Sequence, residues 1–136
     1  MSGSKSLDLQ RAEQALRAVE DLKGKNKNIG HYVSYVRALP ANILQNGLGQ
    51  SLATLLAASK SNQEDPHRLL HAQIQSWLCR EHADAPYAGK PNLIQAITEG
   101  GEQAYLHAHA EALAYLVWLK KFAVAFLSDS DHGETR

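Results

Sequence analysis

The sequence has 136 residues, of which 14 are basic, 14 are acidic and 44% are hydrophobic. A chain of this size and composition folds as one domain with a real core, which argues against two domains and against extensive disorder. Its single cysteine, Cys79, excludes an internal disulfide framework and fits a reducing compartment. The N-terminus lacks the apolar core of a signal peptide, and charges interrupt the apolar stretch 105–127, so we expect a cytoplasmic protein with no membrane contact.

Charge is distributed unevenly along this formally neutral chain. No acidic residue lies between Asp21 and Glu64, so one segment is basic and the remainder is acidic. Such an asymmetry favours a polyanion or an acidic partner at one face. The basic residues of the segment are Lys23, Lys25, Lys27, Arg37 and Lys60.

The first elements are predicted to be helices. Apolar residues at intervals of three and four predict an amphipathic helix over 6–23, with Ser6 as its cap and Gly24 as its stop. The following lysine-rich segment, KGKNKN, is expected to be a solvated loop. A second helix begins near Ile29 and is predicted to end near Leu39, because a residue that precedes proline disfavours the helical backbone region.

The central stretch is mostly apolar but is interrupted by a Gln-Asn-Gly sequence. Pro40 suits the first position of a new short helix over 40–46, which Asn46 and Gly47 would end. A further helix is predicted over 48–60, followed by a polar loop. The free N–H groups at the start of that helix could bind a phosphate.

The second half continues in the same pattern. Pro66 is expected to start a helix that runs to about His82, and two prolines and a glycine mark a surface loop over 84–91. Asn92 caps a short helix, and the last helix is predicted over 102–128. We therefore predict an all-α fold, a single compact bundle of six to seven helices around a long apolar C-terminal helix. Residues 1–128 would form the domain, and residues 129–136 a flexible polar tail.

Seven histidines raise the possibility of a metal site. His67 and His71 are four residues apart and could share one helical face, as two zinc ligands would. His82 would lie roughly 16 Å further along the helix axis, which is too far to join them. His107 and His109 diverge on a helix and cannot chelate together. We therefore expect no metal, no cofactor and no catalytic residue, since no nucleotide-binding or catalytic motif is present either.

The last helix carries two adjacent lysines that point to different faces. Lys121 falls on a strip of polar and small residues that includes Glu111, whereas Lys120 points about 100° away, among leucines. Lys120 either extends along its own stem to water or meets an anion or a partner carboxylate. Trp118 borders the polar strip and is either an edge of the core or an anchor for a protein contact.

Two runs carry a family resemblance: YVSYVRALPANILQNGLGQSLATLLA, which starts at Tyr32, and AEALAYLVWLKKFAVAFL near the C-terminus. Together they resemble the small helical subunit of the Cmr complex, the type III-B CRISPR RNA-guided effector of antiviral defence. The likeness covers roughly residues 7–127, and the middle from Ser61 to Gly101 is generic. The resemblance implies a non-catalytic subunit whose copies stack into a minor filament, touch the backbone and large subunits, and line the groove that holds guide and target RNA.

The resemblance agrees with the charge pattern, because RNA held through its backbone requires cations that reach phosphates while base pairing with the guide reads sequence. The alternative is a helical adaptor that binds only protein, with its basic face on acidic subunits. A metal-dependent enzyme ranks third. The predicted RNA-binding residues are Lys23, Lys25, Lys27, Arg37, Gln45, Asn46, Lys120 and Lys121, and neutral Gln50 belongs to the same polar cluster as Gln45.

Overall fold

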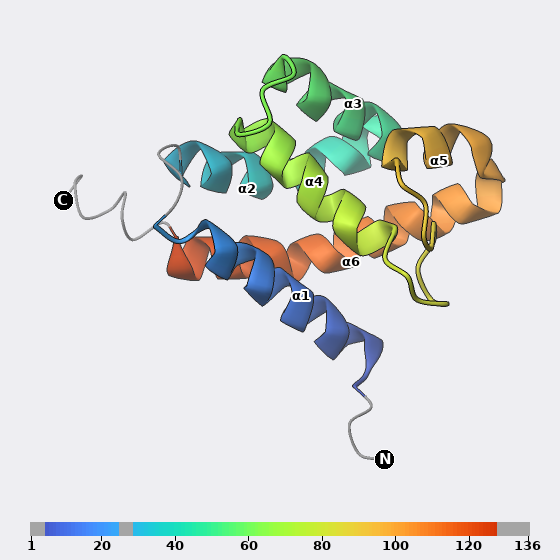
Figure 1. The fold of residues 1–136 in the computed structure, drawn as a ribbon, viewed down its shortest axis with the longest axis horizontal. Helices are drawn as coiled ribbons and strands as arrows, with labels where there is room; N and C mark the ends of the chain where they lie inside the picture. The colour runs from blue at the N-terminus through green and yellow to red at the C-terminus, as the bar shows by residue number, and fades with distance from the viewer. Residues whose placement is uncertain (1–4, 25–28, 128–136) are drawn as a thin grey trace.

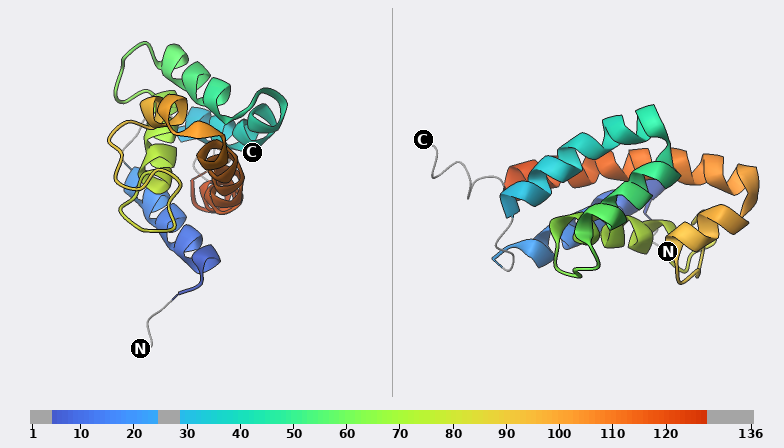
Figure 2. Two further views of the ribbon diagram at one scale, coloured as in Figure 1. Left: turned by 90° about the vertical axis from the view of Figure 1, so that its right-hand side faces the viewer. Right: turned by 90° about the horizontal axis from the view of Figure 1, so that it is seen from above.

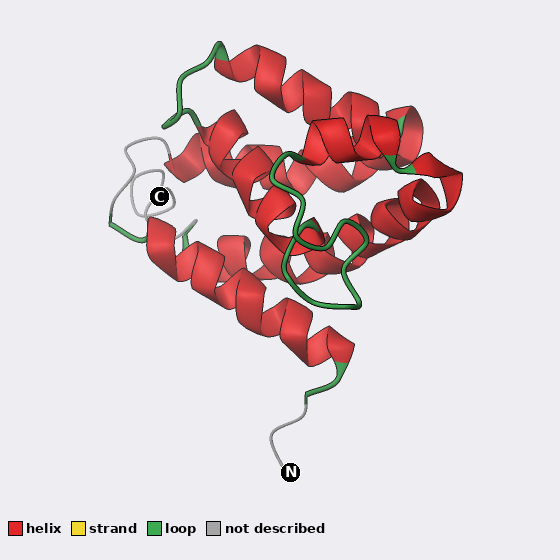
Figure 3. Cartoon of the chain, turned by 45° about the vertical axis from the view of Figure 1, so that its right-hand side comes forward, coloured by secondary structure: helices red, strands yellow, loops and turns green. Residues whose placement is uncertain are grey.

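The computed structural model describes residues 5–24 and 29–127, which contain six α-helices and no strand. This result confirms the predicted all-α class, and Figures 1 and 3 show the helices and the loops that join them. No helix in the described ranges is long and apolar enough to cross a membrane. The helices are α1 (Leu7–Leu22), α2 (Ile29–Asn46), α3 (Leu48–Ser59), α4 (Pro66–Leu78), α5 (Leu93–Glu99) and α6 (Gly101–Phe126).

The longest helix, α6, lies against each of the other five helices. In Figure 1 it lies between α2 above and α1 below; both helices pack along it, and α2 runs in the opposite direction (Figures 1 and 2). The fully buried side chains of α6 include Tyr115, Leu116 and Leu119, which belong to the hydrophobic core. The expected bundle around a long C-terminal helix is therefore confirmed.

The first helix begins and ends where its sequence predicts. The Ser6 side chain accepts a hydrogen bond from the backbone N–H of Leu9, which satisfies one of the free N–H groups of the first turn. Gly24, just beyond the end, has φ +75°, a conformation that glycine adopts without steric cost. Lys25 and Lys27 lie outside the described residues, as does the predicted tail over 129–136.

The predicted break before Pro40 is wrong, because α2 is continuous from Ile29 to Asn46 with Pro40 inside it. Proline removes the hydrogen bond to the carbonyl four residues earlier, which costs about 3 kcal/mol in a helix interior. Buried side chains on both sides, Val36, Leu39 and Ile43, share one face and hold the helix against the core. Tertiary packing therefore overrides the local preference of the residue before proline.

The junction of α2 and α3 is a single glycine. Gly47 has φ +91° and ψ 158°, a region that residues with a Cβ rarely occupy, so the chain turns sharply there. The hydroxyl of Tyr105 on α6 accepts a hydrogen bond of 2.9 Å from the Gly49 N–H in the first turn of α3. An intramolecular partner therefore takes one of the N–H groups that the sequence offered to a phosphate.

The fourth helix is shorter than predicted and ends at Leu78 instead of near His82. The following loop folds back, since Tyr87 N–H donates to the Leu78 carbonyl and Gly89 N–H to the Cys79 carbonyl. These bonds satisfy helix-end carbonyls that continued helix would otherwise use. The loop is therefore packed and only partly exposed, with Tyr87 4% exposed and Cys79 9% exposed. Asn92 caps α5 as predicted, accepting from Gln95 N–H.

Candidate interaction surface

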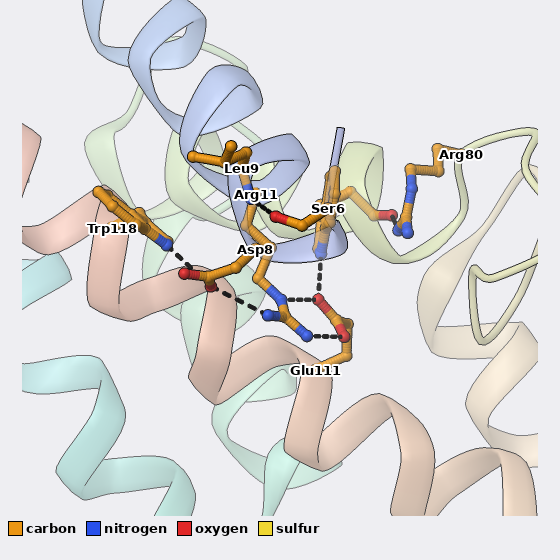
Figure 4. A network of polar contacts seen from close by, with 8 residues as sticks. Ser6, Asp8, Leu9, Arg11, Arg80, Glu111 and Trp118 are labelled. Atoms are coloured by element: carbon orange, nitrogen blue, oxygen red, sulfur yellow. Dashed lines mark hydrogen bonds and ion pairs between the residues drawn. The ribbon is translucent and has the colours of Figure 1, made fainter. Parts of the chain in front are cut away.

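A buried polar network joins α1, α4 and α6. The Glu111 carboxylate accepts two hydrogen bonds from the Arg11 guanidinium, at 2.6 and 2.9 Å, and a third from Trp77 Nε1 at 2.9 Å. Figure 4 shows the Arg11 side chain between this carboxylate and Asp8, to which it donates at 3.0 Å. Glu111 is 4% exposed, so this member of the strip of polar and small residues lies inside the bundle. A partner a hundred residues earlier in the chain explains its burial.

The electrostatics of this network keep Glu111 ionised. Burial alone would raise the pKa of the Glu111 carboxyl, but hydrogen bonds from Arg11 and Trp77 and the nearby guanidinium charges outweigh burial and lower it. Arg80 adds to this field, with its guanidinium 3.6 Å from the centre of the Trp77 ring. Burial lowers the pKa of Arg80. The network therefore holds α1, α4 and α6 together, and both Glu111 oxygens already accept hydrogen bonds.

Trp118 takes part in the same contact between α1 and α6. Its Nε1 donates to Asp8 Oδ1 at 3.1 Å, and its ring lies 5.7 Å from that of Phe122, measured between ring centroids. This indole is partly buried, and its polar end is used inside the chain (Figure 4). The intramolecular contact favours the core-edge interpretation, while a role as a protein-contact anchor stays a prediction.

The predicted basic residues of α6 lie on its open side. Lys120 and Lys121 are both exposed and form no ion pair with a described residue. Between their directions runs a row of residues spaced by three and four, which we call the α6 strip: Leu106, Ala110, Leu113 and Val117. Leu106 is 60% exposed and Val117 is 52% exposed, whereas Leu113 is partly buried.

The sequence analysis missed this strip because the long apolar helix was expected to be covered on most sides. The signal that could have revealed it is the position of the two lysines, which flank Val117 on the helical wheel at about 100° per residue. Lysines on both sides of an apolar row indicate that the row reaches solvent. Exposed apolar surface rimmed by charge is typical of interaction sites.

Arg37 lies on an exposed edge of α2. Tyr35, on one edge of α2, stacks on His67 of α4 with 3.8 Å between ring centroids. On the wheel Arg37 and Leu44 lie roughly opposite that edge, and both are exposed, Leu44 by 71%. Because the Tyr35 edge faces α4, these two residues lie on the edge of α2 remote from α4.

The other predicted RNA-binding residues are distributed more widely. Gln45 and Asn46 are exposed at the end of α2, near the Gly49 contact with Tyr105. Tyr105 precedes Lys120 by fifteen residues, or about 22 Å along α6 at 1.5 Å per residue. Lys23 lies at the other end, with Nζ 5.6 Å from the centre of the Phe126 ring. Arg37, Lys120 and Lys121 are therefore exposed on two helices that pack together, and Lys23 lies near the C-terminal end of α6. Gln45 and Asn46 lie near the other end of α6.

The histidine pair is divided between two environments. His67 is partly exposed, with Nδ1 2.8 Å from Asp65 Oδ1, while His71 is 8% exposed. Among the described residues, no three His, Cys, Asp or Glu side chains are grouped closely enough to hold a metal ion.

Comparison with known families identifies the chain. The family model of the CRISPR-associated protein Cas_Cmr5 matches residues 7–126, which is most of the chain. The chain therefore belongs to this family and is a subunit of the CRISPR Cmr complex. The predicted resemblance to the small helical subunit is confirmed.

Proposed function

We propose that this member of the Cas_Cmr5 family is a non-catalytic structural subunit of the Cmr effector, whose copies stack into a minor filament and help to hold guide and target RNA. The supporting observation is the α6 strip, which Lys120 and Lys121 flank, together with the exposed Arg37 on α2, a helix that packs against α6. Apolar surface supplies protein contact, and the cations supply contact with phosphates.

The protein-contact part of the proposal rests on Leu44, Leu106 and Val117. Each of these side chains is more than half exposed. Burying them against a neighbouring subunit would remove apolar surface from water at about 25 cal/mol per Å². We propose further copies of the chain and the backbone and large subunits of the complex as the partners.

The RNA-contact part rests on cations that have no acidic partner within the described residues. Arg37, Lys120 and Lys121 keep their charges available for phosphates, whereas Arg11 and Arg17 are paired with carboxylates. Contacts to phosphates do not depend on base identity, which suits a subunit of an effector whose guide reads the sequence. Lys25 and Lys27 remain part of the proposal on their charge alone.

A salt series on the assembled complex tests the RNA contact. One variant replaces Arg37, Lys120 and Lys121 by alanine, and a second replaces Lys23, Lys25 and Lys27. Each lost phosphate contact is expected to lower the slope of log affinity against log salt by about 0.7 to 0.9 and to weaken all guide-matched RNA targets equally. A control with Lys60→Ala and Lys90→Ala, two exposed lysines elsewhere, should leave the slope unchanged.

The alternative function, a protein-only adaptor, is favoured by the apolar character of the strip between the lysines. If both cation variants assemble normally and keep the target affinity and its salt slope, RNA contact is refuted and the adaptor takes its place. To test protein contact, Leu106→Glu with Val117→Glu should prevent incorporation while the isolated chain stays folded by circular dichroism. The matched control is Leu9→Glu, since Leu9 is 54% exposed on α1.

A further inference from the structure

A second feature of the bundle is a cavity of about 550 Å³ between α3, α4 and α5, on residues that the proposed interaction surface does not use. Its size falls within the range of about 300 to 1,000 Å³ that is typical of small-molecule sites. Seven of the ten lining residues are polar, namely Gln63, Arg68, His71, Gln75, Asn92, Gln95 and Thr98, and Leu56, Ala72 and Ile94 form apolar walls.

The central observation is the buried imidazole of His71. The residue is 8% exposed, and its Nε2 is enclosed with no hydrogen-bond partner among the described residues. Burial, helped by the charge of Arg68, lowers the pKa of His71 to about 4, so the ring is neutral at pH 7. An unpaired buried nitrogen costs about 1 to 3 kcal/mol. Because His71 lines the cavity, a ligand toward which the ring turns would recover that cost.

The neighbouring groups offer both donors and acceptors. Asn92 uses its side-chain oxygen to cap α5, and its NH₂ group has no partner among the described residues. Gln95 donates to Glu99, and its side-chain oxygen likewise has no partner within the described ranges. Arg68 is held by a hydrogen bond from Nε to Ser59 Oγ at 3.1 Å. Gln75 is already occupied, since it accepts from Leu93 N–H and thereby places α5. The cavity thus combines one fixed cation with separate donor and acceptor positions.

The lining also excludes several classes of ligand. No carboxylate of the described residues lines the cavity, so a metal cation or a basic peptide would find no counter-charge. A purely apolar ligand would leave His71 and the free amide groups unpaired. A planar heterocycle with alternating donors and acceptors, attached to an anionic group, satisfies the amides, the neutral imidazole and the guanidinium together.

We propose that the cavity between α3, α4 and α5 binds a nucleotide, with the base among His71, Asn92 and Gln95 and the phosphate near Arg68. The aliphatic walls and the guanidinium plane would pack on the faces of the base, as arginine does in RNA recognition. This site goes beyond the proposed function and does not depend on phosphate contacts made by α2 and α6.

The test uses the full chain labelled with ¹⁵N and titrated with the four ribonucleoside monophosphates. The expected result is a saturable shift of the His71 ring nitrogens and of the backbone amides of Arg68 and Gln95 with at least one nucleotide. Ribose 5-phosphate and inorganic phosphate serve as probes without a base. Equal shifts with either of them, or no shift with any nucleotide at millimolar concentration, would overturn the nucleotide assignment.

Variants separate binding from folding. His71→Leu should weaken nucleotide binding at least tenfold, but it changes a buried side chain, so Gln95→Leu on the exposed face of α5 provides a second test. The matched control is Gln103→Leu, an exposed glutamine on α6 outside the cavity. Unchanged affinity in a folded Gln95→Leu variant, confirmed by circular dichroism, would refute the role of this amide and the proposed orientation of the base.

The nucleotide could be free or part of an RNA strand, and a short single-stranded RNA distinguishes the two sources. Tighter binding of the RNA at the same residues assigns the site to a base within a strand, whereas binding of mononucleotide alone assigns it to a free nucleotide. Replacing Arg37, Lys120 and Lys121 should leave the mononucleotide shifts intact. The proposal that the cavity binds a nucleotide and the proposal that Arg37, Lys120 and Lys121 contact RNA can therefore be refuted independently.

Discussion

Replacing Glu111 by glutamine should destabilise the fold by about 2 to 3 kcal/mol at pH 7. The substitution keeps the shape of the side chain and an acceptor for Trp77, so the loss is mainly that of the negative charge that Arg11 grips with two hydrogen bonds. Removing one partner of a buried pair typically costs about 3 to 5 kcal/mol. We expect less here, because the Arg11 side chain is 17% exposed and retains Asp8 as a second partner.

The lowered pKa of Glu111 also predicts how the cost of this substitution changes with pH. Because the folded state lowers the pKa of Glu111 below its ordinary 4.5, its stabilising effect is complete above that pH and is lost as the pH falls through the folded pKa. The difference in unfolding free energy between the natural chain and Glu111→Gln should therefore be constant near neutral pH. It should shrink as the pH falls below about 4.5.

The assay is urea unfolding followed by circular dichroism at several pH values, with the slope against urea checked for constancy. Glu13→Gln provides the control, since Glu13 makes ion pairs with Lys5 and Arg17 that are exposed to solvent and should contribute little. In a double-mutant cycle, Arg11→Ala and Glu111→Gln together should cost less than the sum of the two single substitutions, because both remove the same ion pair. Equal costs for the two glutamine variants, or a Glu111 effect that persists unchanged in acid, would refute this reasoning.

Three further predictions concern local features. Gly47→Ala should destabilise the fold by about 1 to 3 kcal/mol in urea unfolding, because φ is +91° and the new Cβ would lie 3.3 Å from the Tyr105 hydroxyl; a neutral effect would contradict the observed turn. Tyr105→Phe should cost about 0.5 to 1.5 kcal/mol through loss of the bond to Gly49 N–H, and an unchanged urea midpoint would argue against that contact. Burial raises the pKa of the Cys79 thiol, so a thiol reagent at pH 8 should label the folded chain much more slowly than the chain in urea. Equal labelling rates would contradict its burial.

The sequence by itself determined the helices, because their signals are local. Apolar spacing, the Ser6 and Asn92 caps and the glycines at helix ends act within one or two turns and needed no knowledge of distant residues. The two quoted runs also carried the family, which the match over residues 7–126 confirmed. Local rules misled where contacts from elsewhere in the chain opposed them, as at Pro40, where buried neighbours keep α2 continuous, and at Leu78, where loop hydrogen bonds end α4 early.

Only the tertiary structure decided which side of each helix meets water and which polar groups meet one another. The helical wheel placed Glu111 on a strip of polar and small residues, but it did not show that Arg11, a hundred positions earlier, and Trp77 would enclose it. In the same way, α6 looked apolar enough to be covered on most sides, yet Leu106 and Val117 remain exposed because the other helices pack on its remaining faces. Helix periodicity fixes angles within one element, but burial depends on where chain segments far apart in sequence come to lie, and that is a property of the whole fold.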